Sequence, residues 1–196
     1  MMKRLLSVAI LACAASAPVL AAVTWDEGVN GDLSNASASP TSLGVLAAGT
    51  STVNGSIGTL FSSDPRDTFS FTVSGGYQLS ALVFGNYSYG TYYDYTPISL
   101  YSGPMPSGSQ LNFILLTSFG AGTDLLNFSS LHGPLAAGTY TLSLNSIQQD
   151  AAVDERSTYS IDFTVSPTAV PEPENYALIL TGLALVGAAV RRRKAP

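Results

Sequence analysis

The stretch Thr158-Tyr159-Ser160-Ile161-Asp162-Phe163-Thr164-Val165 decides the fold class of this chain. Large apolar or aromatic side chains alternate in it with smaller polar ones, the period of a β-strand with one buried face and one face in water. The same alternation recurs over 68–73 and over 139–144. Weaker strand patterns cover 50–53, 56–61, 78–84, 97–101 and 111–118. About eight antiparallel strands with no convincing helix predict an all-β domain, an antiparallel β-sandwich or jelly roll.

The charge of the chain restricts its partners. The chain has 196 residues and a formal net charge of −5, which suits one globular domain with extra segments at its ends. Residues 23–170 hold two Arg against eleven Asp and Glu, a balance of −9. This balance argues against nucleic acid or anionic lipid as the partner of the domain.

Both ends of the chain carry targeting patterns. Residues 1–22 have a basic start, an apolar stretch and small residues before the end, which predicts a secretory signal peptide. The alternative is a lipoprotein signal in which Cys13 is acylated. The second apolar run, 176–190, is followed at once by four cations, which predicts a single transmembrane helix with its basic end in the cytoplasm. This run spans about 22 Å as a helix, short of the ~30 Å hydrocarbon core, and a buried core helix is its alternative.

These patterns divide the chain into five parts. They are a signal peptide over 1–22, a β-sandwich ectodomain over 23–166, a Pro-rich linker over 167–175, the helix over 176–190 and a basic tail over 191–196. The basic cluster comprises Arg191, Arg192, Arg193 and Lys194.

The linker contains Pro171, Glu172 and Pro173. The order Pro-Glu-Pro, short apolar span, Arg cluster and chain end, over 170–194, resembles the PEP-CTERM sorting signal of Gram-negative bacteria. The resemblance implies a substrate of an exosortase, a membrane cysteine protease or transpeptidase that recognises the three motif residues and removes the tail. It also implies a transient inner-membrane anchor with the ectodomain in the periplasm, then delivery to the cell surface or extracellular matrix, where exopolysaccharide is a candidate partner.

The domain itself has a looser resemblance. The stretch Asp64-Pro65-Arg66-Asp67-Thr68-Phe69-Ser70-Phe71-Thr72-Val73, with the later strand patterns up to 165, resembles bacterial pre-peptidase C-terminal domains. The resemblance implies a small jelly-roll sandwich that serves adhesion or stability and is not an enzyme.

Few residues of the domain suit catalysis. Residues 23–170 contain a single His, His132, with no Cys and no Lys, and they contain no Gly-x-Ser-x-Gly motif. The sequence therefore predicts a protein that is not an enzyme. A secreted hydrolase that uses paired Asp residues stays as an alternative, because carboxylates on distant strands can meet in space.

Asp64 and Asp67 are a candidate calcium site, and no other cofactor is expected. The two residues flank Pro65-Arg66 just before a strand, and calcium prefers carboxylate and carbonyl oxygens. The sequence favours, over an ion site, a turn in which the two Asp side chains accept backbone hydrogen bonds and Arg66 offsets their charge.

A tyrosine-rich segment lies between Asn86 and Pro97. Its rings could stack on sugars, which makes it a candidate glycan contact, while a strand pair packed half into the sandwich is the alternative. The sequence thus predicts an exported, non-catalytic surface or matrix protein, with a carbohydrate-binding or adhesion module as the alternative. The segment contains Tyr87, Tyr89, Tyr92, Tyr93 and Tyr95.

Overall fold

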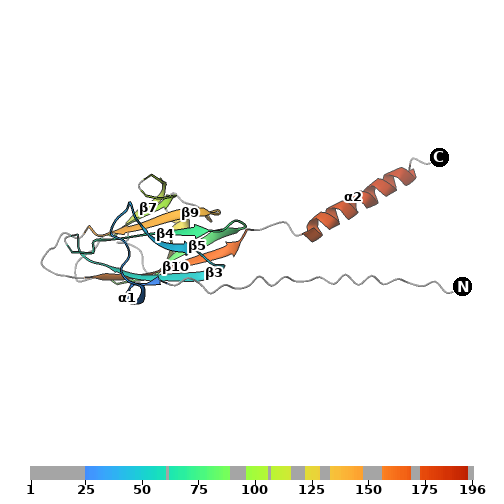
Figure 1. Cartoon of the computed structure of the whole chain (residues 1–196). Coiled ribbons are helices and arrows are strands. Elements are labelled where there is room, and N and C mark those ends of the chain that lie inside the picture. The colour runs from blue at the N-terminus through green and yellow to red at the C-terminus, as the bar shows by residue number, and fades with distance from the viewer. Residues whose placement is uncertain are drawn as a thin grey trace.

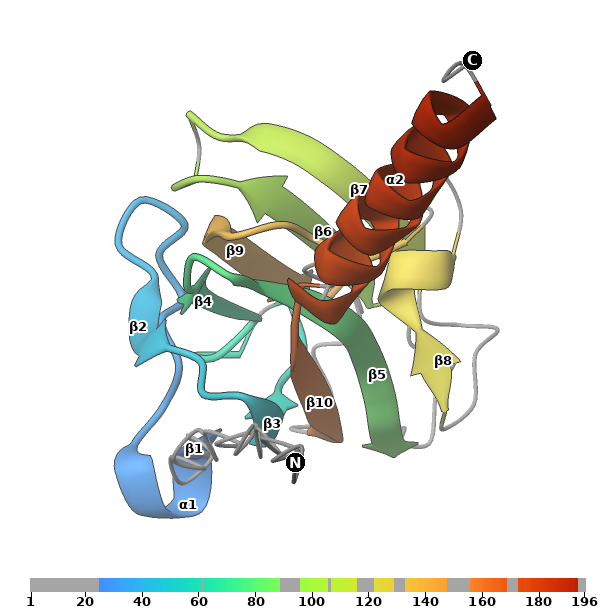
Figure 2. The same cartoon turned by 90° about the vertical axis from the view of Figure 1, so that its right-hand side faces the viewer.

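Two five-stranded sheets pack face to face in the computed structural model, and they form the two layers seen in Figures 1 and 2. The structure describes residues 25–60, 62–88, 96–105, 107–115, 122–128, 133–147, 156–168 and 173–193. The predicted all-β sandwich is confirmed.

The first sheet has the strand order β1-β3-β10-β5-β8. Its strands are β1 (Trp25–Asp26), β3 (Gly49–Ile57), β10 (Ser157–Pro167), β5 (Tyr77–Ser88) and β8 (Thr123–Asp124). The second sheet has the order β2-β4-β9-β6-β7. Its strands are β2 (Thr41–Val45), β4 (Arg66–Val73), β9 (Gly138–Asn145), β6 (Pro97–Ser102) and β7 (Ser109–Leu115). Two short helices, α1 (Glu27–Asn30) and η1 (Leu125–Asn127), adjoin the first sheet through β1 and β8.

The three strongest alternating stretches form central strands. β10 pairs antiparallel with both β3 and β5, and β9 pairs antiparallel with both β4 and β6. In the core, Phe163 of β10 makes edge-to-face contacts with two rings of β4, at centroid distances of 6.1 Å to Phe69 and 5.0 Å to Phe71. These contacts join the two sheets.

Two strand pairs differ from the all-antiparallel prediction. β1 runs parallel to β3, and β2 runs parallel to β4. β2 belongs to the second sheet, whereas β3, which follows three residues later, belongs to the first. Because the chain changes sheet here instead of making a hairpin, β2 is free to pair parallel with its neighbour.

The two strand patterns predicted at 50–53 and 56–61 form the single strand β3, which ends at Ile57. The amide of Gly58 donates a 2.7 Å hydrogen bond to the carbonyl of Asp64. This bond closes a turn between β3 and β4. The chain therefore turns where the second predicted strand would have continued.

The C-terminal helix α2 (Pro173–Arg193) projects away from the sandwich in Figure 1. The side chains of residues 177–187 are exposed, Leu178 and Leu185 among them, so the alternative of a buried core helix is wrong. Among the described residues, no helix is long and apolar enough to cross a membrane. The predicted helix over 176–190 lies within α2, and the predicted membrane span is not found.

Candidate metal centre

Four carboxylates meet where β3 ends and β4 and β10 begin. One oxygen from each of Glu27, Asp32 and Asp67 lies within 4.8 Å of the corresponding oxygens of the other two. Asp64 lies close enough for the charges of Asp32 and Glu27 to raise its pKa. We call these four residues the acidic cluster: Glu27, Asp32, Asp64 and Asp67.

Asp67 is the most deeply buried member of the acidic cluster. It shares the inward face of β4 with Phe69 and Phe71, and its exposed fraction is 0%. The hydroxyl of Tyr159 donates a 2.6 Å hydrogen bond to Oδ2, while Oδ1 has no hydrogen-bond partner among the described residues. Burial raises the pKa of Asp67 to about 9, and the hydrogen bond from Tyr159 opposes this rise.

Asp64 lies in the turn before β4 and is 2% exposed. Its Oδ2 accepts a 3.2 Å ion-pair contact from Nη1 of Arg156, and its Oδ1 has no partner within the part of the chain that the structure describes. Burial raises the pKa of Asp64 to about 6; the carboxylates of Asp32 and Glu27 add to the rise, and Arg156 opposes it. Two buried carboxylates thus each keep one unpartnered oxygen.

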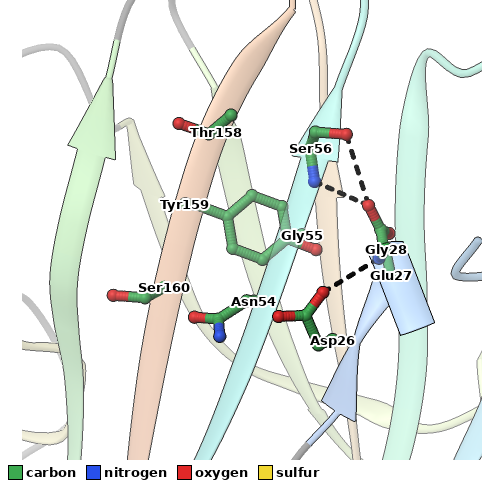
Figure 3. Close-up of a pocket in the computed structure, with 9 residues that line it drawn as sticks. All are labelled: Asp26, Glu27, Gly28, Asn54, Gly55, Ser56, Thr158, Tyr159 and Ser160. Carbon is green, nitrogen blue, oxygen red and sulfur yellow. Dashed lines mark hydrogen bonds between the residues drawn. The ribbon is translucent and has the colours of Figure 1, made fainter. Parts of the chain in front are cut away.

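The side chain of Glu27, the first residue of α1, is held in place by Leu33 and by β3. Its carboxylate accepts hydrogen bonds from the amide of Leu33 at 3.2 Å, and from the amide and hydroxyl of Ser56 at 2.7 and 3.3 Å (Figure 3). Asp26 caps α1 by accepting a 2.9 Å bond from the amide of Gly28, which fixes the turn that carries Glu27. Burial raises the pKa of Glu27, and the backbone bonds from Leu33 and Ser56 oppose it.

Tyr159 reaches Asp67 by crossing over a glycine. Tyr159 and Gly55 are register partners on β10 and β3, and the ring lies beside Gly55 in Figure 3. A Cβ atom on Gly55 would overlap the phenol of Tyr159. Gly55 therefore provides the space through which a side chain of the first sheet hydrogen-bonds to the second. Both residues also line a shallow pocket that opens beside Glu27.

The donor set suits a calcium ion. Calcium binds oxygen ligands at about 2.3–2.6 Å, so two ligands of one ion lie at most about 5 Å apart, and the three carboxylates that meet within 4.8 Å satisfy this limit. Binding a cation would also offset the repulsion among the carboxylates of Glu27, Asp32 and Asp67, and Asp67 has an oxygen without a hydrogen-bond partner.

Their burial makes Asp64 and Asp67 unsuited, as a pair, to the hydrolysis of a polymer. At exposed fractions of 2% and 0%, Asp64 and Asp67 have no surface that a polymer substrate could reach. General acid–base catalysis needs a carboxyl group within hydrogen-bond reach of the scissile bond.

The structure brings together the two predicted calcium ligands, Asp64 and Asp67. The favoured turn, with bonds from backbone amides and Arg66 as the counter-charge, is not what the described residues show. Asp64 instead accepts a bond from Arg156, and Asp67 accepts one from Tyr159. Sequence reasoning missed Glu27 and Asp32. They lie more than thirty residues before Asp64, and the segment that carries them reaches the site through the parallel pairing of β1 with β3 and a bridge between Ser34 and Thr68.

Other predicted sites fall partly or wholly outside the described residues. The signal peptide over 1–22, His132, Pro171, Glu172 and Lys194 lie outside them. Four residues of the candidate glycan contact also lie outside: Tyr89, Tyr92, Tyr93 and Tyr95. The backbone of Tyr87 belongs to β5, opposite Tyr159, while Pro173 begins α2 and residues 191–193 end it.

Comparison with known proteins gives a similarity among solved structures. No family model matches the chain, and no curated protein matches it. Among solved structures, the chain is similar to PliG of Salmonella Typhimurium, a periplasmic lysozyme inhibitor of g-type lysozyme. The two are 17% identical with a TM-score of 0.35, and the match covers 64% of this chain and 99% of PliG.

Proposed function

We propose that the chain is an exported, non-catalytic surface or matrix protein whose β-sandwich binds calcium at the acidic cluster. The observation that carries the calcium assignment is Asp67, which is 0% exposed and has one unpartnered oxygen beside the carboxylates of Glu27 and Asp32. A buried carboxylate without a counter-charge is costly, and a divalent cation removes that cost for several carboxylates at once.

The ion acts as a structural clamp in this proposal. Glu27 and Asp32 come from the N-terminal segment, whereas Asp64 and Asp67 come from the turn and strand that follow β3. An ion shared between the two groups would tie this segment to the sandwich. Extracellular calcium modules bind with dissociation constants of about 10⁻⁴–10⁻³ M, and we expect this range here.

Calcium titration tests this assignment. The chain without its signal peptide is titrated with calcium by isothermal calorimetry, and its thermal unfolding is followed in calcium and in EGTA. We expect one bound ion per chain and a higher Tm in calcium, both lost in Asp67→Asn. The matched control is Asp162→Asn, because Asp162 accepts a 2.6 Å bond from Thr52 on the first sheet and takes no part in the acidic cluster. Binding that survives in Asp67→Asn would contradict the assignment.

The proposal for export and sorting rests on the sequence. The signal-peptide pattern over 1–22 and the PEP-CTERM-like order over 170–194 support secretion, a transient anchor in the inner membrane through the C-terminal apolar run, and processing by an exosortase. After processing, the sandwich would reach the cell surface or matrix, where exopolysaccharide is the proposed partner.

Mass spectrometry of the two terminal peptides, after fractionation of the native host, tests the sorting proposal. We expect a mature chain that begins near Ala22 or Val23 and ends near Pro171 to Pro173, in the outer-membrane or extracellular fraction. A chain that keeps its residues through Val190 in the inner membrane would make the tail a permanent anchor and contradict processing.

A further inference from the structure

A second pocket lies on the second sheet, away from the acidic cluster. It is shallow and is lined by Ser99, Tyr101, Gln110, Leu111, Asn112 and Phe113, all from β6 and β7. The side chains of Ile98 and Leu100 belong to the core. Because side chains alternate along a strand, Ser99 and Tyr101 point to the opposite, outer face of the sheet.

The pairing of β6 with β7 shapes this pocket. Ser99 lies opposite Phe113, and Tyr101 lies opposite Gln110. The register shifts between Leu100 and Tyr101, which leaves Leu111 as an extra residue in β7. Such a bulge bends the strand and breaks the flat surface of the sheet. It accounts for a hollow at this place.

The lining of the pocket combines aromatic rings with uncharged polar groups. Phe113 is 50% exposed, and Tyr101, which lines the same pocket, is partly exposed. The exposed side chain of Gln110 reaches across to Ser99, with 3.5 Å between its Nε2 and the serine Oγ. None of the six lining residues carries a carboxylate, ammonium or guanidinium group. This chemistry suits a neutral ligand that offers C–H faces to the rings and hydroxyls to the amide.

β7 is the edge strand of its sheet, and side-chain hydrogen bonds partly prevent a further strand from pairing with it. Oδ1 of Asn112 accepts a 2.8 Å bond from the amide of Phe113, so this amide is already occupied. The amide nitrogen of the Asn112 side chain donates to the carbonyls of Leu125 and Phe128, at 3.0 and 2.9 Å. These bonds disfavour strand addition, and they hold β7 rigid against η1, so the pocket is formed before a ligand binds.

The neighbouring strand limits how far a ligand extends. On the neighbouring strand β9, the register partners of Tyr101 and Ser99 are Thr141 and Ser143. Both partners are buried, at 0% and 1% exposed. Their hydroxyls are bonded within the protein, Thr141 to the carbonyl of Gly103 at 2.8 Å and Ser143 with Thr68 at 3.2 Å. The binding surface is therefore confined to β6 and β7.

We propose that this pocket binds a neutral polysaccharide chain. Phe113 and Tyr101 stack on the C–H faces of the sugar, and Gln110 hydrogen-bonds to its hydroxyls. The site does not depend on the proposed calcium function, because no residue of the acidic cluster lines it.

Affinity gel electrophoresis of the folded chain without its signal peptide tests the proposal. The gels contain hydroxyethyl cellulose, galactomannan or laminarin as neutral probes, and alginate as the anionic comparison. We expect at least one neutral polymer to retard the wild type. Phe113→Ala and Tyr101→Ala should weaken this retardation about three- to tenfold, and Phe113→Trp should keep it. The matched control is Val45→Ala, which removes a side chain 55% exposed on the opposite edge strand, β2.

Three results would overturn the proposal. They are no retardation by any neutral probe, equal retardation of Phe113→Ala and wild type, and retardation by alginate alone. Phe113 is half exposed, so its loss should leave the fold intact, which circular dichroism checks. Gels run in calcium and in EGTA separate the two sites. Failure of the glycan proposal leaves the calorimetric calcium titration unchanged, and failure of the calcium assignment leaves the retardation unchanged.

Discussion

The hydroxyl of Tyr159 on β10 donates a 2.6 Å hydrogen bond to Oδ2 of Asp67 on β4. The bond is fully buried and joins one sheet to the other at the end of the sandwich where the acidic cluster lies. It fixes the carboxylate of Asp67 and occupies only one of its two oxygens. The other oxygen needs a proton or a cation, so stability at this end should depend on both pH and calcium.

Without calcium, the stability of the sandwich should fall as the pH rises. Burial raises the pKa of Asp67 from 3.8 to about 9, so between these values the folded state holds a proton that the unfolded state has lost. The stabilisation from this proton is fully present below about pH 4 and is lost as the pH rises through about 9. Urea unfolding in EGTA over this range measures the slope. The raised pKa of Asp64, about 6, should add to the fall at acidic pH.

Two variants isolate the source of this pH dependence. Asp67→Asn keeps the shape of the side chain but cannot titrate, so most of the slope should disappear. Asp162→Asn serves as the control and should keep the wild-type slope. Calcium should flatten the slope in the wild type by taking the place of the proton. An unchanged slope in Asp67→Asn would show that Asp67 is not the titrating group.

Gly55→Ala should disturb the acidic cluster from a distance. The added Cβ atom overlaps the ring of Tyr159 and must displace it, which breaks the bond to Asp67. Overpacking of this kind costs about 1–3 kcal/mol of unfolding free energy, and we expect weaker calcium binding as well. Gly75→Ala is the matched control, because a Cβ atom there meets no atom within 4 Å and Gly75 has no positive φ. If both variants unfold at the same urea concentration, Gly55 has no spacing role.

Only part of the acidic cluster could be predicted from the sequence. Asp67 and Tyr159 occupy the inward positions of their strands, in phase with Phe69 and with Ile161. Alternation over 158–165 predicts this position for Tyr159, whereas the strand predicted at 68–73 begins one residue after Asp67. Glu27 and Asp32 have no such signal. They reach the site because β1 adds to β3 in parallel and Ser34 forms a bridge with Thr68 of β4, contacts set by tertiary packing rather than by local pattern. The pocket on β6 and β7 likewise depends on a register shift that alternation does not predict.

Phe163 and Phe113 should differ strongly in their contribution to stability. Phe163 is 0% exposed and contacts the rings of Phe69 and Phe71, so Phe163→Ala should lower the free energy of unfolding by about 3–5 kcal/mol. Phe113 is 50% exposed, so Phe113→Ala should change it by no more than about 0.5 kcal/mol. Chemical denaturation measures both. A large loss in Phe113→Ala would mean that its ring supports the fold instead of facing a ligand.

Deletion of the C-terminal segment should leave the stability of the sandwich unchanged, whereas deletion of the N-terminal segment should lower it. The side chains of residues 177–187 in α2 are exposed, so we expect deletion of residues 169–196 to leave the unfolding midpoint and the calcium affinity unchanged. Deleting residues 23–33 removes Glu27, Asp32 and the buried side chain of Leu33, which is 1% exposed. This second deletion should lower the midpoint and abolish calcium binding. Calorimetry and urea denaturation of the two truncated chains compare them directly. A C-terminal truncation that destabilises the sandwich would show that α2 packs on it in solution.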